Sequence, residues 1–492
     1  MSTTANVKLP VDLDNTFESV IGESPLVTGD ASFHGVTEVV SHVSESRHPP
    51  KAWYVGMAIS LSLLGLMGVM ILYELFVGVG VWGNNQPVSW GFPIINFVFW
   101  VGIAHAGTLI SAILLLFRQK WRTGINRFAE ATTVFAVACA GIFPAIHVGR
   151  PWLAYWLAPY PNIMRDWPNF YSPLLWDALA VGTYTTVSVL FWYTGMIPDL
   201  ATLRDRATGR IKQIAYGIFS LGWRGSARHW ALLEKAVYLL AALATALVLG
   251  VSSTVSTDFA VSQIPAWHET IFPPYFTGGA IFSGFAVVLA LAIPARELFG
   301  LKEVITKRHI DNLAKILLVM SSIVLYIYVI EYFIAYYSGS SFERFPYLNR
   351  LFGPYWWLGW GIMFCNGVVP QVFWFKWARN NPWLGVAVGI LVNMGMWMER
   401  FTIIIISLHR DFVPSSWHMF VPTYVDICTL AGSFGLFFTL FLLFCRYIPM
   451  VAMYEVKSIL PQAQVHHHEP AVVAGDAADA SPQAGVAGVS TV

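Results

Sequence analysis

Residues 90–147 read WGFPIINFVFWVGIAHAGTLISAILLLFRQKWRTGINRFAEATTVFAVACAGIFPAIH. This segment consists of two apolar runs around one basic turn, and each run is near the roughly 20 residues that a helix needs to cross a bilayer. The pattern therefore predicts two membrane-spanning helices joined on one side of the membrane. A third apolar run begins at Ser172-Pro173 and carries Asp177, which places His147 and Asp177 near the same membrane face.

The whole chain has the composition of a polytopic membrane protein. Of its 492 residues, 56% are hydrophobic and only 12% are charged, whereas soluble domains carry about 25% charged residues. The formal net charge of +1 gives no sign of a nucleic-acid partner, and none is expected. The four cysteines lie in apolar runs without a Cys-x-x-Cys pair, which predicts neither an iron–sulfur cluster nor a covalently bound haem in this chain.

Ten apolar runs are long enough to span a membrane, so the predicted fold is an all-α polytopic membrane protein. The runs are 53–80, 93–117, 128–147, 173–194, 230–251, 275–294, 313–338, 355–375, 384–408 and 424–447. Residues 51–452 form the predicted membrane domain. Residues 1–50 are polar and predict a solvent-exposed N-terminal arm, and residues 453–492, which include His466 to His468, predict a flexible C-terminal tail.

The Lys and Arg residues between these runs predict the orientation. Of the 29, 21 fall in the two arms and in the connections on the same side as the arms, and five fall in the opposite connections. By the positive-inside rule, both termini are expected in the cytoplasm. Two similar basic turns, at residues 117–127 and 301–309, predict two four-helix bundles formed by helices two to five and six to nine, with helices one and ten flanking them.

Ionisable side chains inside a membrane are costly and usually functional, so their depth is informative. Most of them are expected in the outer half of the membrane, namely Glu74, His147, Asp177, Asp258, Glu331, Arg400 and Asp426. His105 is expected near the middle, and Glu130, Lys235 and Lys315 near the cytoplasmic ends of their helices. The polar groups are therefore predicted to gather toward the outer face.

Several of these groups have a structural alternative that the sequence leaves open. Glu74 and Asp426 alternatively face interfacial water, and Asp258, which follows a Ser/Thr-rich segment, alternatively caps a loop. His147 alternatively is a core histidine with satisfied hydrogen bonds. Pro144 is expected to bend the end of its helix and to aim the imidazole of His147 off the regular helix face.

The same residue types suit the oxidation of a hydroquinone, which releases two protons. A histidine and a carboxylate can accept protons near neutral pH, and His147 and Asp177 are the candidate pair. The aromatic loop at residues 151–160 is a candidate wall for a flat ring. Arg400 does not readily lose its charge and needs a carboxylate partner, for which Asp177 and Glu331 are the candidates.

Two other functional classes compete with this interpretation. A b-type cytochrome needs two histidines at one depth, but His105 lies about 18 Å below the outer helix end, whereas His147 lies at the outer surface. These two histidines therefore do not ligate one iron. A secondary transporter built from two similar bundles remains the alternative function. Reconstituted alone, a transporter moves a solute, whereas an electron-input subunit needs its partners.

Four motifs resemble the NrfD-like family of polysulfide-reductase membrane subunits. They are WGFPIINFVFWVGIAHAGTLISA (90–112), AIHVGRPW (145–152), SPLLWD (172–177) and NMGMWMERF (393–401). Within that family the chain most resembles the ActC-type subunits of alternative complex III, over about residues 45–455. The resemblance implies ten helices in two bundles with two flanking helices, no redox centre or metal in this chain, and a location in the bacterial inner membrane.

The resemblance also implies a function, partners and a site. A quinol, expected to be menaquinol, would be oxidised near the periplasmic face, and its electrons would pass to an iron–sulfur subunit and then to c-type haem subunits. A homologous NrfD-like membrane subunit and a terminal oxidase are further candidate partners. The implied quinol-site residues are His147, Asp177, Asp258 and Arg400, and the candidate proton-pathway residues are His105, Glu130 and Lys315 from inside and Glu74 and Glu331 outside.

Overall fold

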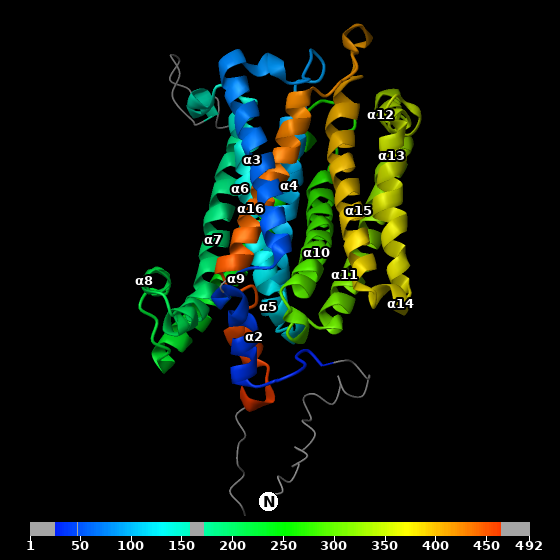
Figure 1. Ribbon diagram of the computed structural model, residues 1–492. Coiled ribbons are helices and arrows are strands. Elements are labelled where there is room, and N and C mark those ends of the chain that lie inside the picture. The colour runs from blue at the N-terminus through cyan, green and yellow to red at the C-terminus, as the bar shows by residue number, and fades with distance from the viewer. Residues whose placement is uncertain (1–24, 47, 158–171, 464–492) are drawn as a thin grey trace, which may run out of the picture.

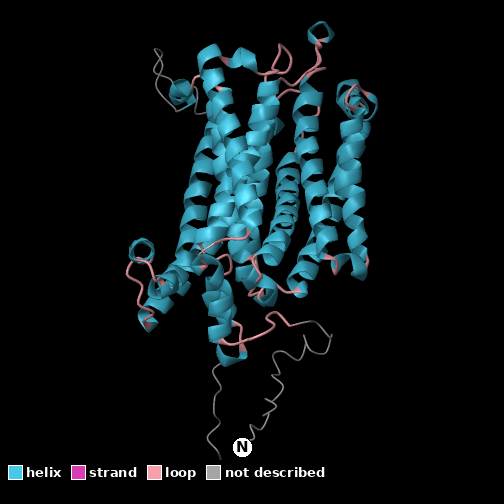
Figure 2. Ribbon diagram, in the orientation of Figure 1, coloured by secondary structure: helices cyan, strands magenta, loops and turns pink. Residues whose placement is uncertain are grey.

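The computed structural model describes residues 25–46, 48–157 and 172–463. These residues form helices and connections without a strand (Figure 2). Nine helices within the described part are long and apolar enough to cross a membrane. They are α3 (Lys51–Val77), α4 with its continuation to Leu116 (Phe92–Leu116), α6 (Asn126–His147), α7 (Pro173–Arg206), α9 (Ala227–Ala260), α10 (Phe272–Leu298), α11 (Lys307–Tyr337), α15 with its continuation to Ile406 (Pro382–Ile406) and α16 (Tyr424–Tyr447).

The predicted run 355–375 is helical but is not one regular helix. It consists of α13 (Trp356–Ile362), a π-helical segment η8 (Met363–Val368) and a 3₁₀ segment η9 (Val369–Trp374). Pro370 lies within the last segment and lacks the N–H that a regular helix would use. Nine of the ten predicted spans are therefore continuous helices in the described part of the chain, and the tenth is built from three pieces.

The spans pack as two groups with one outlying pair (Figure 1). In the first group α4 packs on α6, α6 on α7, and α7 on α9. In the second, α10 packs on α11 and α15, and α15 packs on α13. The groups meet where α4 packs on α10, and α3 packs on α16 outside them. Gly432 and Gly435 permit this last contact, because a Cβ on either would lie within 3 Å of α3 atoms.

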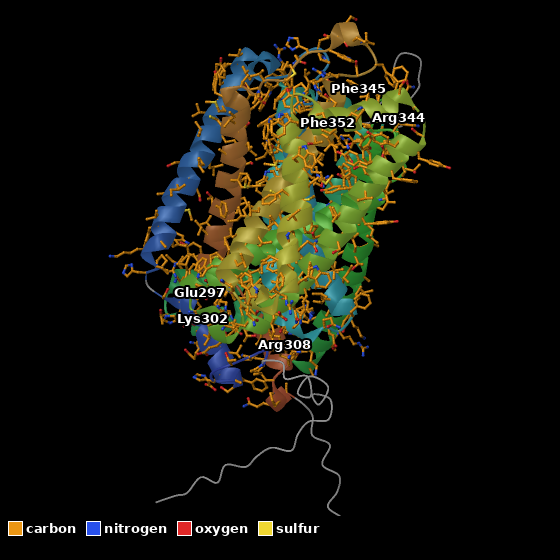
Figure 3. The ribbon with its side chains drawn as sticks, turned by 90° about the vertical axis from the view of Figure 1, so that its right-hand side faces the viewer. Glu297, Lys302, Arg308, Arg344, Phe345 and Phe352 are labelled. Atoms are coloured by element: carbon orange, nitrogen blue, oxygen red, sulfur yellow. The ribbon has the colours of Figure 1, made fainter. Side chains whose placement is uncertain are left out.

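The two ends of the molecule are distinguishable by their residues. We call the end that carries α2 (Phe33–Glu45) and α17 (Met453–Ser458) the terminal face, and the end that carries α12 (Ser341–Phe352) and residues 409–423 the distal face (Figure 1). Figure 3 shows Glu297, Lys302 and Arg308 toward the terminal face and Arg344, Phe345 and Phe352 at the distal face. Exposed tryptophans lie at both ends of the α13–η9 crossing and at the start of α15, as is typical where a helix meets the membrane surface.

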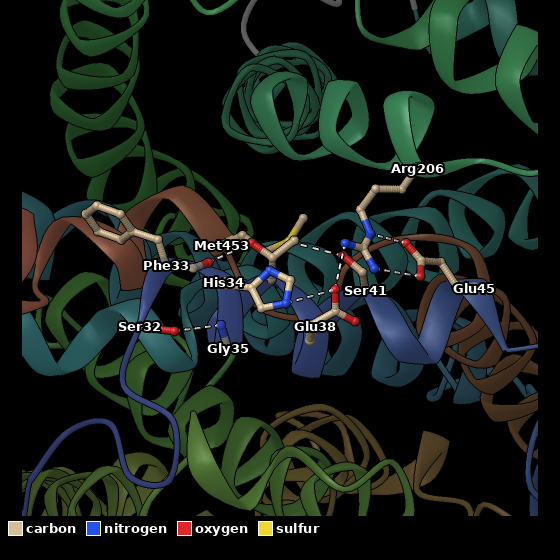
Figure 4. A network of polar contacts seen from close by, with 10 residues as sticks. Ser32, Phe33, His34, Gly35, Glu38, Ser41, Glu45, Arg206 and Met453 are labelled. Carbon is tan, nitrogen blue, oxygen red and sulfur yellow. Dashed lines mark hydrogen bonds and ion pairs between the residues drawn. The ribbon is translucent and has the colours of Figure 1, made fainter. Parts of the chain in front are cut away.

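The described parts of the two predicted arms are folded onto the terminal face, so the prediction that residues 1–50 and 453–492 are exposed and flexible is wrong for these parts. Val36, Val40 and Val43 of α2 are buried on one side of that helix. Arg206 at the end of α7 pairs with Glu38 at 2.8 Å and with Glu45 at 2.5 Å (Figure 4). The valine spacing supplies an apolar face that the low overall hydrophobicity of the arm concealed.

The C-terminal segment is held in the same way. Met453, Val456 and Leu460 are buried, and the backbone N–H of Met453 donates to Asp199 at 3.0 Å. The remaining residues of both arms, including the His466 to His468 triplet, lie outside the described residues. The described N- and C-terminal segments thus close the terminal face of the bundle together.

Candidate functional site

Two carboxyl groups meet near the distal ends of α7 and α9. Pro173 occupies the first turn of α7, and Asp177 follows one turn later, whereas Asp258 lies in the last turn of α9. The two carboxyl groups lie within hydrogen-bonding reach of one another. Asp177 is only 5% exposed, and neither of its oxygens has another partner among the described residues. Such a pair is suited to holding one proton between two carboxyl groups.

His147 ends α6 on the same face, as predicted from Pro144 and the length of the apolar run. Its Nδ1 is buried and has no hydrogen-bond partner among the described residues. No hydrogen bond or ion pair of the described part joins it to Asp177 or Asp258. Beyond it, η5 (Pro151–Leu157) carries the exposed side chains of Trp152 and Tyr155, and the rest of the predicted aromatic loop lies outside the described residues.

Arg400 does not pair with Asp177 or Glu331, and that prediction is wrong. Its Nη1 lies 2.5 Å from Oε1 of Glu399, the preceding residue, and both side chains are buried. The guanidinium carbon also lies 4.7 Å from the centre of the Phe276 ring. Tyr328 donates a hydrogen bond to the other oxygen of Glu399. Adjacent residues on a helix do not normally face one another, so no helical periodicity in the sequence indicates this pairing.

A small cavity joins Arg400 to His105 across the seam between the two helix groups. It is lined by His105 of α4, Ser252 of α9, Phe276 of α10 and Arg400 of α15, among others, and has a volume of about 10 Å³. That is about the room that one water molecule needs. Both His105 Nε2 and Ser252 Oγ lack a partner among the described residues. Asp258 lies six residues after Ser252, so the carboxyl pair stands toward the distal face from this cavity.

A third cluster lies on the distal side of the second group, and only its Glu331 is predicted from the sequence. Tyr347 of α12 donates to Glu269 at 2.5 Å, and its hydroxyl lies 3.2 Å from Glu331. Arg350 Nη1 lies 3.5 Å from Glu331. Burial, reinforced by the charge of Glu331, raises the pKa of Glu269, which lies in a loop outside the spans, to about 8. A carboxyl group at the mouth of a buried chain is thus set to exchange protons near neutral pH.

This raised pKa predicts a pH-dependent stability. An unfolded Glu has a pKa of about 4.3, so between about pH 4 and pH 8 the folded protein binds a proton that the unfolded chain releases. The free energy of unfolding is therefore expected to be highest at low pH and to fall as pH rises to about 8. Glu269→Gln should flatten this decline in the thermal midpoint of the solubilised protein between pH 5.5 and 8.5. Glu234→Gln, which removes an exposed carboxyl, should leave the wild-type decline; equal slopes for all three proteins would contradict the prediction.

Glu130 lies in a fourth cluster at the terminal face of the first group. Ser111 donates a hydrogen bond to Glu130. Nearby, Arg122 lies 2.6 Å from Glu455 of α17, and Arg127 lies 2.5 Å from Asp199. These two ion pairs are not predicted from the sequence, because one acid falls in the predicted flexible tail and the other in a predicted connection.

The other predicted residues lie apart from these clusters. Glu74 is fully buried and accepts from Trp82 Nε1 at 2.8 Å, and Asp426 is fully buried and accepts from the backbone of Gly83 and Thr423. The alternative that these two carboxyls face interfacial water is therefore wrong. Lys315 pairs with Asp311 at 2.6 Å, and its side chain is 47% exposed.

No group of three or more His, Cys, Asp or Glu side chains that could hold a metal ion occurs in the described ranges. The fold and the buried acid–base groups together define a multi-pass membrane protein with titratable clusters along the seam between two helix groups. Its polar chemistry consists of carboxyl, imidazole, phenol and guanidinium groups.

Comparison with known proteins gives the family. Residues 80–410 match the model of the family described as polysulphide reductase, NrfD, so the chain belongs to the NrfD family. The chain is 21% identical over 410 residues to the C subunit of the selenate reductase of Mesobacillus selenatarsenatis, and the match covers 79% of this chain and 93% of that protein. It is 26% identical over 244 residues to the putative C-type membrane subunit of a dimethyl sulfoxide reductase of Halobacterium salinarum, and this match covers 47% of this chain and 51% of that protein. The chain is thus an NrfD-type membrane subunit, and its relatives belong to oxidoreductase complexes.

Proposed function

We propose that this chain is the quinol-oxidising subunit of a respiratory oxidoreductase, of the type found in alternative complex III. A quinol, menaquinol in this proposal, binds near the distal face, where His147, Asp177 and Asp258 accept its protons. Arg400 acts from deeper in the seam. The chain supplies the binding site and the proton acceptors, and the electrons leave through another subunit.

The observation that carries this proposal is the meeting of Asp177 and Asp258. Two carboxyl groups from separate helices lie together with unpartnered oxygens, close to the distal ends of α7 and α9. Buried polar groups are normally hydrogen-bonded, and unpartnered ones need a functional or structural reason. A hydroquinone hydroxyl that donates to this pair satisfies an oxygen and presents its proton to a base.

The orientation we propose places the terminal face in the cytoplasm and the distal face in the periplasm of a bacterial inner membrane. The excess of Lys and Arg in the connections of the terminal face supports it. Exposed apolar side chains at the distal face, including Phe352, Phe412, Val413 and Val421, suit contact with an extramembrane partner. An iron–sulfur subunit followed by c-type haem subunits is the partner set proposed there. A second NrfD-like subunit and a terminal oxidase are proposed as neighbours in the membrane.

Proton transfer across the membrane is the second part of the proposal. From the cytoplasmic side, Glu130 bonds Ser111, and one turn away Thr108 lies 2.8 Å from the hydroxyl of Tyr184. The Tyr184 ring lies 4.9 Å from that of His105, which lines the cavity shared with Arg400. This sequence of polar groups is the proposed inner half of the route.

The outer half runs through the second group. The Glu399–Arg400 pair acts electrostatically on Glu331, whose carboxyl neighbours the hydroxyl of Tyr347 and, through it, Glu269. No hydrogen bond or ion pair among the described residues joins Lys315 or Glu74 to this route, so we do not include them in it. The proposed path thus changes from the first group to the second at the small cavity.

The test uses the complex purified with its partner subunits and returned to vesicles. We expect it to oxidise a menaquinol analogue and to change the internal pH, whereas the chain alone should neither oxidise quinol nor move a solute. Glu130→Gln should keep quinol oxidation within about twofold but reduce the pH change. A solute flux by the isolated chain would instead support the alternative, a secondary transporter. Quinol oxidation by the complex without this chain would contradict the proposal.

A further inference from the structure

The segment that joins α7 to α9 is unlike the other connections of the protein. It contains the helix α8 (Arg210–Phe219), which lies beside the end of α7 at the level of the other helix ends of the terminal face (Figure 1). None of its residues is buried. Ile211, Ile214 and Ile218 recur at helical spacing and are 85%, 54% and 65% exposed. Isoleucines that recur in this way form one apolar face, and this face has no protein cover in the described part of the chain.

Charge identifies what covers this face. Residues 207–233 contain Arg210, Lys212, Arg224 and Arg228 and no acidic residue. The opposite side of α8 is attached to the body of the protein, because Tyr216 donates to the backbone of Tyr447 at 2.9 Å and Tyr193 to that of Phe219 at 2.7 Å. A helix with an apolar face and basic flanks lies in the plane of an anionic membrane surface.

A cavity next to α8 supplies a seat for an anionic head group. It has a volume of about 500 Å³ and lies between the end of α7, the turn at Trp223 and Arg224, Trp230 of α9, and Lys457 of α17. Two acidic side chains also line it, but Asp199 pairs with Arg127 and Asp205 pairs with Arg204.

Two cations in this cavity remain uncompensated. Among the described residues, the side chains of Arg224 and Lys457 make no ion pair and no hydrogen bond. Burial lowers the pKa of Lys457, which reflects a cation that is partly removed from water without a close counter-charge. A phosphate group between Arg224 and Lys457 would supply that counter-charge.

We propose that α8 and this cavity form a binding site for an anionic phospholipid of the cytoplasmic leaflet, with its phosphate at Arg224 and Lys457 and its acyl chains along the isoleucines of α8. The proposal uses the orientation proposed above and is independent of quinol oxidation. It explains with one ligand both the exposed apolar face and the unpaired cations. The shared chemistry with a soluble anion is the phosphate, so the test separates the two sources.

The test measures lipid retained by the full chain in detergent by native mass spectrometry. With phosphatidylglycerol as the probe, we expect strong retention, and with phosphatidylcholine weak retention. Arg224→Gln with Lys457→Gln should reduce phosphatidylglycerol retention on the order of tenfold, because both basic residues attract the anionic head group. Lys376→Gln, an exposed lysine of the same face under the second helix group, is the matched control and should change nothing.

Two outcomes would overturn the proposal. One is phosphatidylglycerol retention that is equal in the double variant and in the control. The other is displacement of the lipid by inorganic phosphate at similar concentrations, which would indicate a site for a soluble anion. A fluorophore at Ile211→Cys, in a Cys428→Ser background, gives an independent measurement. It should be quenched by brominated lipids in vesicles, and quenching by aqueous iodide alone would contradict the membrane-bound position of α8.

Discussion

Asp177→Asn is expected to reduce quinol oxidation by the assembled complex about 100-fold or more, because a positioned base typically contributes roughly 10²- to 10⁴-fold. Asparagine keeps the shape of the side chain but cannot take a proton. The carboxyl of Asp177 is buried and its only described partner is Asp258. The measurement is the rate of menaquinol-analogue oxidation by wild-type and variant complexes that contain each subunit in equal amounts.

A change in folding can be separated from this loss. Burying a carboxyl without a full set of partners is costly, so the thermal midpoint of Asp177→Asn should stay the same or rise. Asp258→Asn should lower the rate to a similar degree, and the double variant should be no slower than either single variant, since residues that act as a unit are not additive. Asp411→Asn is the matched control at the same face. Its carboxyl accepts from the backbone of Val413 at 3.0 Å, a role that an amide oxygen retains, and its rate should be unchanged.

If Asp177→Asn and Asp258→Asn both oxidise quinol at the wild-type rate, the proposed site is wrong. The further inference about α8 would be unaffected by that result, because it concerns a lipid at the opposite face. If only Asp258→Asn is silent, Asp177 acts alone and the shared-proton arrangement has no catalytic role.

Arg400→Met is expected to destabilise the folded protein by about 3–5 kcal/mol, the usual cost of leaving one member of a buried ion pair without its partner. The Arg400–Glu399 pair is short, at 2.5 Å, and both side chains are almost fully enclosed. Methionine fills much of the same volume but leaves Glu399 charged in an apolar seam. The thermal midpoint and the midpoint of unfolding in mixed micelles are the measurements.

The double variant Glu399→Gln/Arg400→Met distinguishes the ion pair from simple packing. Removing both charges should recover most of the lost stability, since the penalty comes from the unpaired charge. Arg410→Met is the control: Arg410 lies over the Trp417 ring and is partly exposed, and its loss should cost less than about 1 kcal/mol. A double variant as unstable as Arg400→Met would show that the guanidinium is needed for another contact, such as that with Phe276.

The local pattern of the chain predicts much of the site's content but little of its pairing. The length of one apolar run and the position of Pro144 place His147 at the distal end of its helix. Ser172 and Pro173 place Asp177 one turn into the next helix. These placements need only the number of residues that cross a membrane and the preference of proline for a first helical turn.

Pairing depends on helix rotation and helix contacts, which the runs do not contain. Depth alone makes Asp177 or Glu331 the expected partner of Arg400, but Arg400 meets the adjacent Glu399. Composition predicts a flexible tail around Glu455, but this residue pairs with Arg122 at 2.6 Å. A loop cap is as good an interpretation of Asp258 until α9 is seen to continue past it and to bring it against Asp177.

The order of the amino acids is enough to establish that the chain crosses the membrane many times, where each crossing lies and which ionisable groups lie within it. These properties follow from the cost of exposing polar backbone and side chains to lipid, which each segment meets separately. Only the folded chain reveals which acid faces which acid, that its two described ends close the same face, and that the crossing near residue 366 is broken. Lipid is as apolar as the helix surfaces themselves, so hydrophobicity does not select between neighbours, and close packing and buried polar contacts choose the partners instead.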